Sequence, residues 1–216
     1  MAQKRVAFLT TGQSPRTDVV PEMVEEIKKP IEVIEAGMLD DLSPAEIVGL
    51  RPAAGAPVIV SRLRDGSEVV MDHREVSARL QPLIDANEGA DVLVLLCTGS
   101  FPTLSARSAL VKAGPVVDDQ IATLGRSGQR IGVMVPGAAQ VRHYHDAASG
   151  KVIAAHASPY GRPRWREAVR ELADADVIVM HCMGYDRATR EHVAGLSGKP
   201  TLLSRSLVAS AVAELL

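Results

Sequence analysis

The two cysteines of the chain, Cys97 and Cys182, occur in matching surroundings. Each ends an apolar run and is followed two positions later by glycine, in ADVLVLLCTG at residues 90–99 and in ADVIVMHCMG at residues 175–184. A thiolate and a thiol on opposite faces of a carbon atom beside a carboxylate can remove its proton from one side and supply a proton from the other. The pair therefore predicts reversible proton transfer in which acid and base have the same side chain.

Polar residues near the expected strand ends are suited to holding the substrate. Backbone N–H groups after a strand end lower the pKa of a thiol, and they also bind a carboxylate or the enediolate charge that follows deprotonation. Arg16 and Arg205 add guanidinium groups that can bind a carboxylate with two hydrogen bonds. The residues expected to bind substrate are Thr11, Gly12, Gln13, Ser14, Arg16, Thr98, Gly99, Ser100, Pro136, Gly137, Met183, Gly184, Tyr185, Ser204 and Arg205.

The sequence predicts neither a cofactor nor a metal site. The glycines after the expected strands fit neither the GxGxxG nor the P-loop spacing. His143 and His145 are two residues apart on an expected helix, so their rings lie on different faces. His181 and Cys182 are neighbours on an expected strand and point in opposite directions.

Apolar runs that alternate with amphipathic segments position these residues. The runs expected to be strands are 5–12, 31–37, 90–96, 130–137, 151–159, 175–181 and 199–204. Continuous rather than alternating apolar runs indicate parallel strands that are buried on both faces, and ligands of such sheets bind at the carboxyl ends of the strands. The sequence therefore predicts an α/β fold whose site lies where the cysteines are.

Most of the remaining segments are expected to be helices, apart from a hairpin and one short strand. Two alternating runs in residues 56–72 flank the turn Arg64–Ser67 and predict a β-hairpin. Ser43 and Pro44 predict the start of a short helix, and either Ser14 or Thr17 is expected to cap an earlier one. After the first cysteine we expect a helix over residues 100–114 and a short strand over residues 115–119.

An internal repeat predicts the architecture. Each half of the chain contains a strand that ends in glycine and a strand that ends in Cys-x-Gly. We therefore expect two similar Rossmann-like lobes with mainly parallel sheets, related by a pseudo-twofold axis, with a cleft between them. Lobe one is expected to comprise residues 1–100 plus 200–216, and lobe two residues 101–199.

Bulk composition narrows the function classes. The 216 residues have a formal net charge of -2 without a basic stripe, which argues against nucleic-acid binding, and 46% are hydrophobic. No apolar run reaches the length of a membrane span, and the N-terminus lacks the pattern of a signal peptide. We therefore expect a cytoplasmic protein with reduced thiols, no membrane partner and a small-molecule carboxylate as its ligand; the sequence leaves a homo-oligomer open.

Three segments carry a resemblance to a known family. TTGQSPR near the start, the RDGSEVV hairpin and LLSRSLVASAVAELL at the end resemble the AroM family, within the aspartate/glutamate racemase superfamily. The resemblance implies a cofactor-independent racemase, isomerase or decarboxylase of small carboxylates or hydantoins, with Cys97 and Cys182 in the catalytic positions. Met183-Gly184 stands where racemases of that superfamily have Thr-His, which points away from glutamate or aspartate as substrate.

Three functions remain open on these grounds. The first is a racemase or isomerase of a small carboxylate that uses both cysteines as an acid/base pair. The second is a decarboxylase, or another lyase or isomerase, in which a single cysteine acts. The third is a binding or regulatory protein that keeps the cleft without turnover.

Overall fold

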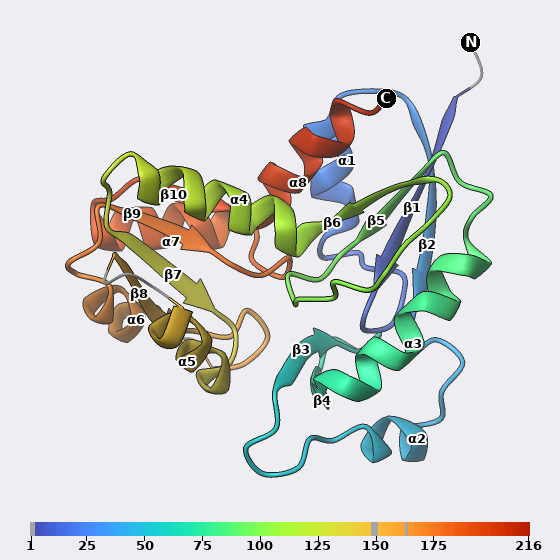
Figure 1. The fold of residues 1–216 in the computed structure, drawn as a ribbon, viewed down its shortest axis with the longest axis horizontal. Coiled ribbons are helices and arrows are strands. Elements are labelled where there is room, and N and C mark those ends of the chain that lie inside the picture. The colour runs from blue at the N-terminus through green and yellow to red at the C-terminus, as the bar shows by residue number, and fades with distance from the viewer. Residues whose placement is uncertain (1–2, 148–150, 163) are drawn as a thin grey trace.

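The chain folds around two separate four-stranded sheets, seen side by side in Figure 1. The computed structural model describes residues 3–147, 151–162 and 164–216. All neighbouring strands of the first sheet are parallel, in the order β2 (Ile31–Gly37), β1 (Lys4–Thr10), β5 (Val92–Leu95) and β6 (Ala109–Lys112). The apolar runs of β1 and β5 form its buried centre, as continuous apolar strands require.

The second sheet repeats the topology of the first. It is also fully parallel, in the order β8 (Val152–His156), β7 (Ile131–Val135), β9 (Val177–Met180) and β10 (Thr201–Leu203). In each sheet the second strand along the chain lies at one edge, and the first and third strands occupy the centre. The prediction of an α/β fold with two similar lobes is confirmed, and each cysteine follows the third strand of its own sheet.

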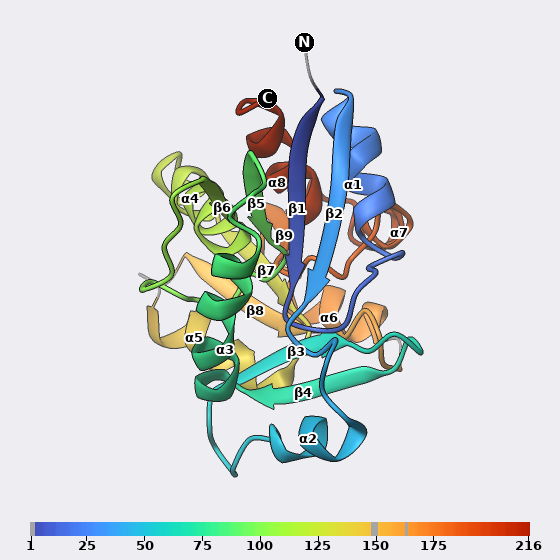
Figure 2. The same ribbon diagram turned by 90° about the vertical axis from the view of Figure 1, so that its right-hand side faces the viewer.

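Helices cover both faces of each sheet, and two of them cross between the lobes (Figures 1 and 2). The first sheet is covered by α3 (His73–Ala86) on one face and by α1 (Val20–Ile27) and α8 (Ser204–Ala213) on the other. The second sheet is covered by α6 (Trp165–Glu171) and α7 (Arg187–Ser197) on one face and by α4 (Ala113–Arg126) and α5 (Ala138–Ala147) on the other. The helix that follows the last strand of each sheet therefore packs on the other sheet.

Strand pairing places the sheet boundaries later than expected. β6, expected in lobe two, pairs with β5 in the first sheet, and β10, expected in lobe one, pairs with β9 in the second. Only α8, from Ser204 onward, crosses back to the first sheet. The boundary at residue 100 precedes β6, whose residues were expected to be helical, and the boundary at residue 200 falls within the run 199–204 that was expected to be a strand.

Two local predictions are wrong, and one cap is misplaced. Residues 100–114 form a loop followed by β6, and residues 115–119 lie inside α4 rather than in a strand. Pairing with the open edge of β5 outweighs the local helical preference, and Pro115 fits the first turn of α4, where its missing N–H has no partner to lose. α1 begins at Val20 rather than near Ser14 or Thr17, because Ser14 binds Asp40 instead.

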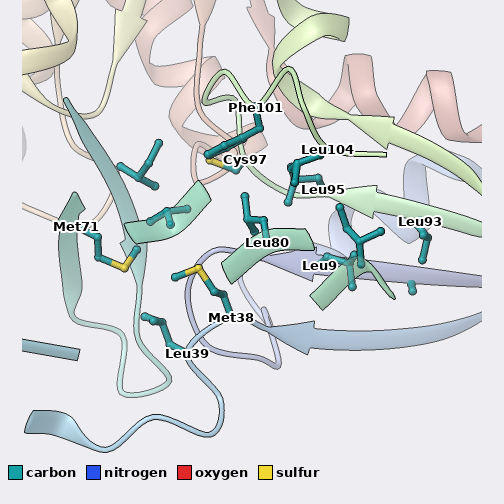
Figure 3. Packing of buried hydrophobic residues seen from close by; sticks show 14 of the residues in the cluster. Leu9, Met38, Leu39, Met71, Leu80, Leu93, Leu95, Cys97, Phe101 and Leu104 are labelled. Carbon is teal, nitrogen blue, oxygen red and sulfur yellow. The ribbon is translucent and has the colours of Figure 1, made fainter. Parts of the chain in front are cut away.

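The predicted hairpin is confirmed and covers the carboxyl end of the first sheet. Its strands are β3 (Val58–Arg62) and β4 (Glu68–Asp72). The short helix α2 (Pro44–Gly49) has the expected N-cap at Ser43, which forms a capping box with Glu46. Figure 3 shows the core beneath it, a buried cluster that includes Met71 of β4, Leu80 of α3, Leu95 of β5 and Cys97 just after β5. Among the described residues, no helix combines the length and apolar character that crossing a bilayer would require.

Candidate active site

Cys97 and Cys182 line the same narrow crevice between the lobes. The crevice has a volume of about 20 Å³, close to the space that one water molecule needs, and lies where β5 and β9 end. Seven further residues predicted to bind substrate line it as well: Thr11, Arg16, Thr98, Gly99, Pro136, Met183 and Gly184. The duplicated sheets thus bring one thiol from each lobe to a common space.

The two thiols have equivalent contacts. The backbone N–H of Gly99 donates to Cys97 Sγ, and that of Gly184 donates to Cys182 Sγ, each at 3.4 Å. Burial raises the pKa of both thiols above the usual value, to about 11 for Cys182, while these N–H groups partly oppose the rise. Each thiol is therefore neutral at physiological pH in the unliganded crevice, with a donor already in place to stabilise a thiolate.

Side chains pack closely against the glycine two residues after each cysteine. A Cβ on Gly184 would collide with the hydroxyl of Tyr160, and a Cβ on Gly99 would lie 2.7 Å from Ile59 Cδ1. Both colliding groups line the crevice. The Cys-x-Gly pattern therefore reflects a wall that approaches the backbone directly behind each thiol.

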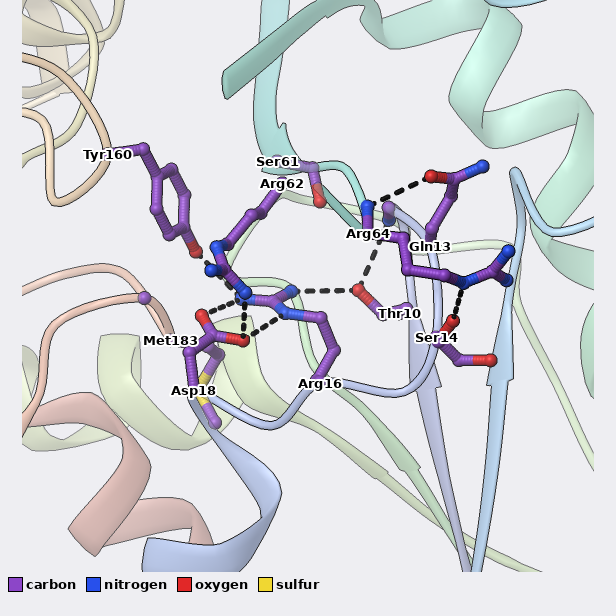
Figure 4. Close-up of polar contacts among 12 residues, drawn as sticks. Thr10, Gln13, Ser14, Arg16, Asp18, Ser61, Arg62, Arg64, Tyr160 and Met183 are labelled. Carbon is purple, nitrogen blue, oxygen red and sulfur yellow. Dashed lines mark hydrogen bonds and ion pairs between the residues drawn. The ribbon is translucent and has the colours of Figure 1, made fainter. Parts of the chain in front are cut away.

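Arg16 is the buried cation of the crevice, and its fork is already occupied (Figure 4). Its Nε and Nη2 donate to the two oxygens of Asp18 at 2.8 Å each, Nη2 also donates to the hydroxyl of Tyr160 at 2.8 Å, and Nη1 donates to Thr10 Oγ1 at 2.9 Å. Burial opposes the charge on Asp18, but the hydrogen bonds from Arg16 outweigh it and hold the pKa of Asp18 below its usual range. An incoming carboxylate therefore meets a guanidinium that is already paired with Asp18 rather than a free bidentate fork.

A family model described as AroM protein matches residues 6–216 of the chain. The chain belongs to the AroM family. The match covers both cysteine segments and both sheets. A search of curated protein sequences finds no match to this AroM chain.

Solved structures of the same fold include racemases and a decarboxylase. Glutamate racemase from Aquifex pyrophilus aligns over 98% of this chain and 84% of its own, with a TM-score of 0.57 and 13% identity. Aspartate racemase from Picrophilus torridus aligns over 98% and 93%, with a TM-score of 0.55 and 10% identity. Arylmalonate decarboxylase aligns over 97% and 92%, with a TM-score of 0.53 and 14% identity. At such identities the likeness establishes the fold of this AroM-family chain.

The other predicted site residues lie around the crevice rather than on it. Ser100 lines an adjoining cavity. Tyr185 is fully buried and donates to the carbonyl of Ala157, and Ser204 donates to the carbonyl of Met180. Arg205 donates to the carbonyls of Asp18 and Met183. These three residues support the wall that carries Cys182.

Gln13 and Ser14 hold the hairpin in place. Gln13 accepts from the backbone N–H of Arg64 at 2.9 Å, and the carbonyl of Ser14 accepts from Arg64 Nε at 2.8 Å (Figure 4). Gly12 packs against the carbonyl of Arg62 at the end of β3, while Gly137 lies outside the crevice lining, beside Val60. The segment 12–14 thus fixes the position of the hairpin over the site.

Six crevice residues were not singled out from the sequence: Ile59, Val60, Ser61, Leu96, Gln140 and Tyr160. Three come from β3, and the predicted hairpin was the only signal that could have indicated them. Tyr160 lies in the loop after β8, a segment without periodicity. Its contact with Arg16 joins residues 144 positions apart in the chain.

The described residues show no group of three or more His, Cys, Asp or Glu side chains placed to hold a metal ion. His181 binds Asp118 through Nε2 at 3.0 Å, on the side of the adjoining cavity. The side chain of His145 lies outside the described part of the chain. The crevice itself offers thiols, hydroxyls and one guanidinium, a set suited to anion binding and proton transfer.

Proposed function

We propose that this AroM-family chain is a cofactor-independent racemase or isomerase of a small carboxylate, with Cys97 and Cys182 as its acid/base pair. One observation carries the proposal. Two thiols from equivalent positions in duplicated lobes line one crevice and accept equivalent backbone hydrogen bonds. The racemases among the structures of the same fold are consistent with this chemistry.

The proposed reaction needs one thiolate and one thiol, so one of the two neutral thiols first releases its proton to solvent. The thiolate takes the proton from the carbon beside the carboxylate, so the C–H bond breaks, an S–H bond forms and the electron pair passes into an enediolate. The opposite thiol then donates its proton to the other face of that carbon and becomes the thiolate. The charge of Arg16 and the crevice hydroxyls of Thr11, Ser61 and Thr98 stabilise the enediolate.

Proton exchange with solvent tests this proposal. A panel of chiral 2-substituted carboxylates is incubated with the enzyme in D₂O, and loss of the α-proton signal is followed by NMR together with optical rotation. The wild-type enzyme should exchange and invert at least one substrate, and Cys97→Ser and Cys182→Ser should each lower inversion by at least about a hundredfold. Binding without exchange across the panel would replace the proposal with a non-catalytic binding role.

The neutral state of both thiols favours a second candidate, a decarboxylase. Loss of CO₂ from a substituted malonate leaves a carbanion, which a single neutral thiol can protonate. Burial raises the pKa of Cys97 and Cys182 alike, which keeps such a donor protonated. Under this mechanism one cysteine variant retains full CO₂ release, measured with a substituted malonate, whereas the two-cysteine racemase loses inversion in both variants.

A further inference from the structure

A second cavity adjoins the crevice in the cleft between the lobes. This adjoining chamber has a volume of about 450 Å³ and shares four lining residues with the crevice, namely Ile59, Thr98, Gly99 and Gln140. β3, α4 and α5 all contribute residues to its walls. A ligand whose reacting carbon lies between the thiols can therefore extend past Thr98 into the chamber.

Apolar side chains form much of the chamber wall. Val58 and Ile59 come from the hairpin, Val135 from the end of β7, Pro102 from the loop after Cys97, and Ala139 from α5. Apolar walls with a few placed polar groups are typical of small-molecule sites. The chamber is therefore built for a body larger and less polar than an amino acid side chain with a charged end.

The one acidic side chain of the described chamber lining disfavours a second carboxylate. None of the described residues that line it is Lys or Arg, and its acidic residue, Asp118, has a side chain that is 58% exposed. A second carboxylate placed there would meet this like charge, and the basic side chains of the described lining are the histidines His73, His143 and His181. The chamber therefore favours a neutral group over the second carboxylate of a glutamate-type substrate.

His181 and Asp118 form a hydrogen-bonded polar pair in the chamber lining. His181 is buried, and its Nε2 lies 3.0 Å from Asp118 Oδ1; the ring of Tyr144 packs edge-on against His181 with centroids 5.5 Å apart. Burial, followed by the nearby charge of Asp118, raises the pKa of Tyr144 above its usual value, so its hydroxyl stays neutral. The exposed carboxylate of Asp118 is an acceptor for a ligand O–H or N–H.

We propose that the substrate is a monocarboxylate whose reacting carbon bears a neutral, ring-sized group, and that this group occupies the adjoining chamber with a hydroxyl or N–H directed at Asp118. This inference rests on the proposed function for the placement of the carboxylate between the thiols. It adds a substrate class and a specificity residue that the thiol pair alone does not define.

Binding of three probes to the full chain tests the inference by calorimetry. The probes are 4-hydroxyphenylacetate, phenylacetate and succinate. We expect both ring-bearing probes to bind more tightly than succinate, and the hydroxyl to add about tenfold in affinity, as a hydrogen bond to a charged acceptor does. Asp118→Asn should reduce that hydroxyl preference to less than about threefold, whereas Asp119→Asn, the neighbouring exposed change on α4, should leave it intact.

A steric variant tests the location independently of charge. Ala139→Phe places a ring in the chamber and should weaken both ring-bearing probes about tenfold or more, while Ala138→Phe, on the same helix but outside the chamber lining, should not. Equal binding of succinate and phenylacetate, or equal effects of the two phenylalanine variants, would overturn the inference.

The outcomes distinguish a failure of the chamber assignment from a failure of the proposed function. Cys97→Ser should keep the same order of probe affinities although it loses proton exchange. If the probe pattern holds and no carboxylate exchanges, the chamber stands and the proposed function fails. If exchange occurs only with dicarboxylates and the probe pattern is absent, the proposed function stands and the chamber assignment fails.

Discussion

The buried thiols couple the chemistry of the site to the stability of the fold. Burial raises the pKa of Cys182 from the ordinary value of 9.0 to about 11, and it also raises the pKa of Cys97. As the pH rises, the unfolded chain releases these protons first, so unfolding becomes more favourable between pH 9 and about 11. The contribution of the neutral thiols to the free energy of unfolding is therefore complete below pH 9 and is lost progressively above it.

Urea denaturation at pH 8 and pH 10 under reducing conditions measures this loss. At pH 10, Cys182 should account for about 1 kcal/mol of the decrease in the free energy of unfolding, since one unit of pKa difference corresponds to about 1.4 kcal/mol. Cys182→Ser, which does not titrate there, should show a smaller decrease. An unchanged pH dependence in that variant would mean that the thiol is not held neutral in the folded state.

The close approach behind Cys182 gives a second prediction at the residue scale. Gly184→Ala should lower the free energy of unfolding by about 1 to 3 kcal/mol, because the added methyl group must displace Tyr160 and Pro159. Gly195→Ala is the matched control: Gly195 lies within α7 with open space around it, so alanine should stabilise the chain by up to about 1 kcal/mol. Urea unfolding of both variants compares them, and similar effects would show that the tight wall is absent.

At the scale of elements, the sequence predicted the strands, the hairpin and the helix start that depend on local residue patterns. Seven apolar runs are strands, the hairpin and its turn are in place, and the helix start at Ser43 has the expected cap. The predicted helix over residues 100–114 failed because β6 exists only through its pairing with β5, a contact that local preference does not encode.

The predicted and the missed site residues also differ in whether local pattern or distant contacts determine their positions. Cys97 and Cys182 follow continuous apolar strands in the two halves of an internal repeat, and that repeat predicted that they would meet. Tyr160 reaches Arg16 from an irregular loop, and Asp18 occupies the fork of that arginine, which the sequence pattern had assigned to substrate. Contacts across the cleft, such as that between Arg16 and Tyr160, depend on how the lobes dock, and no local sequence pattern predicts them.

At the scale of the whole molecule, the crossing of α4 and α8 makes each lobe incomplete without the other. Val208 of α8 is fully buried in the core of the first sheet, together with Phe8 of β1 and Val94 of β5. In return, Val117 of α4 packs on the second sheet. A sheet that loses the helix donated by the other half exposes an apolar face, so we expect both lobes to unfold in one cooperative transition.

Trp165, the single tryptophan, lies on α6 in the second lobe. Its fluorescence therefore shows whether a mutation in the first lobe also destabilises the second. Val208→Ala, which removes a buried side chain over the first sheet, should lower the free energy of unfolding by about 2 kcal/mol. The urea midpoint should fall equally whether followed by Trp165 fluorescence or by far-UV circular dichroism. Val48→Ala, at a half-exposed position on α2, should change it by less than about 0.5 kcal/mol. A fluorescence midpoint that stays fixed while the circular dichroism midpoint shifts would show that the lobes unfold separately. The crevice would then be assembled by docking of two independent units rather than fixed by the exchange of helices.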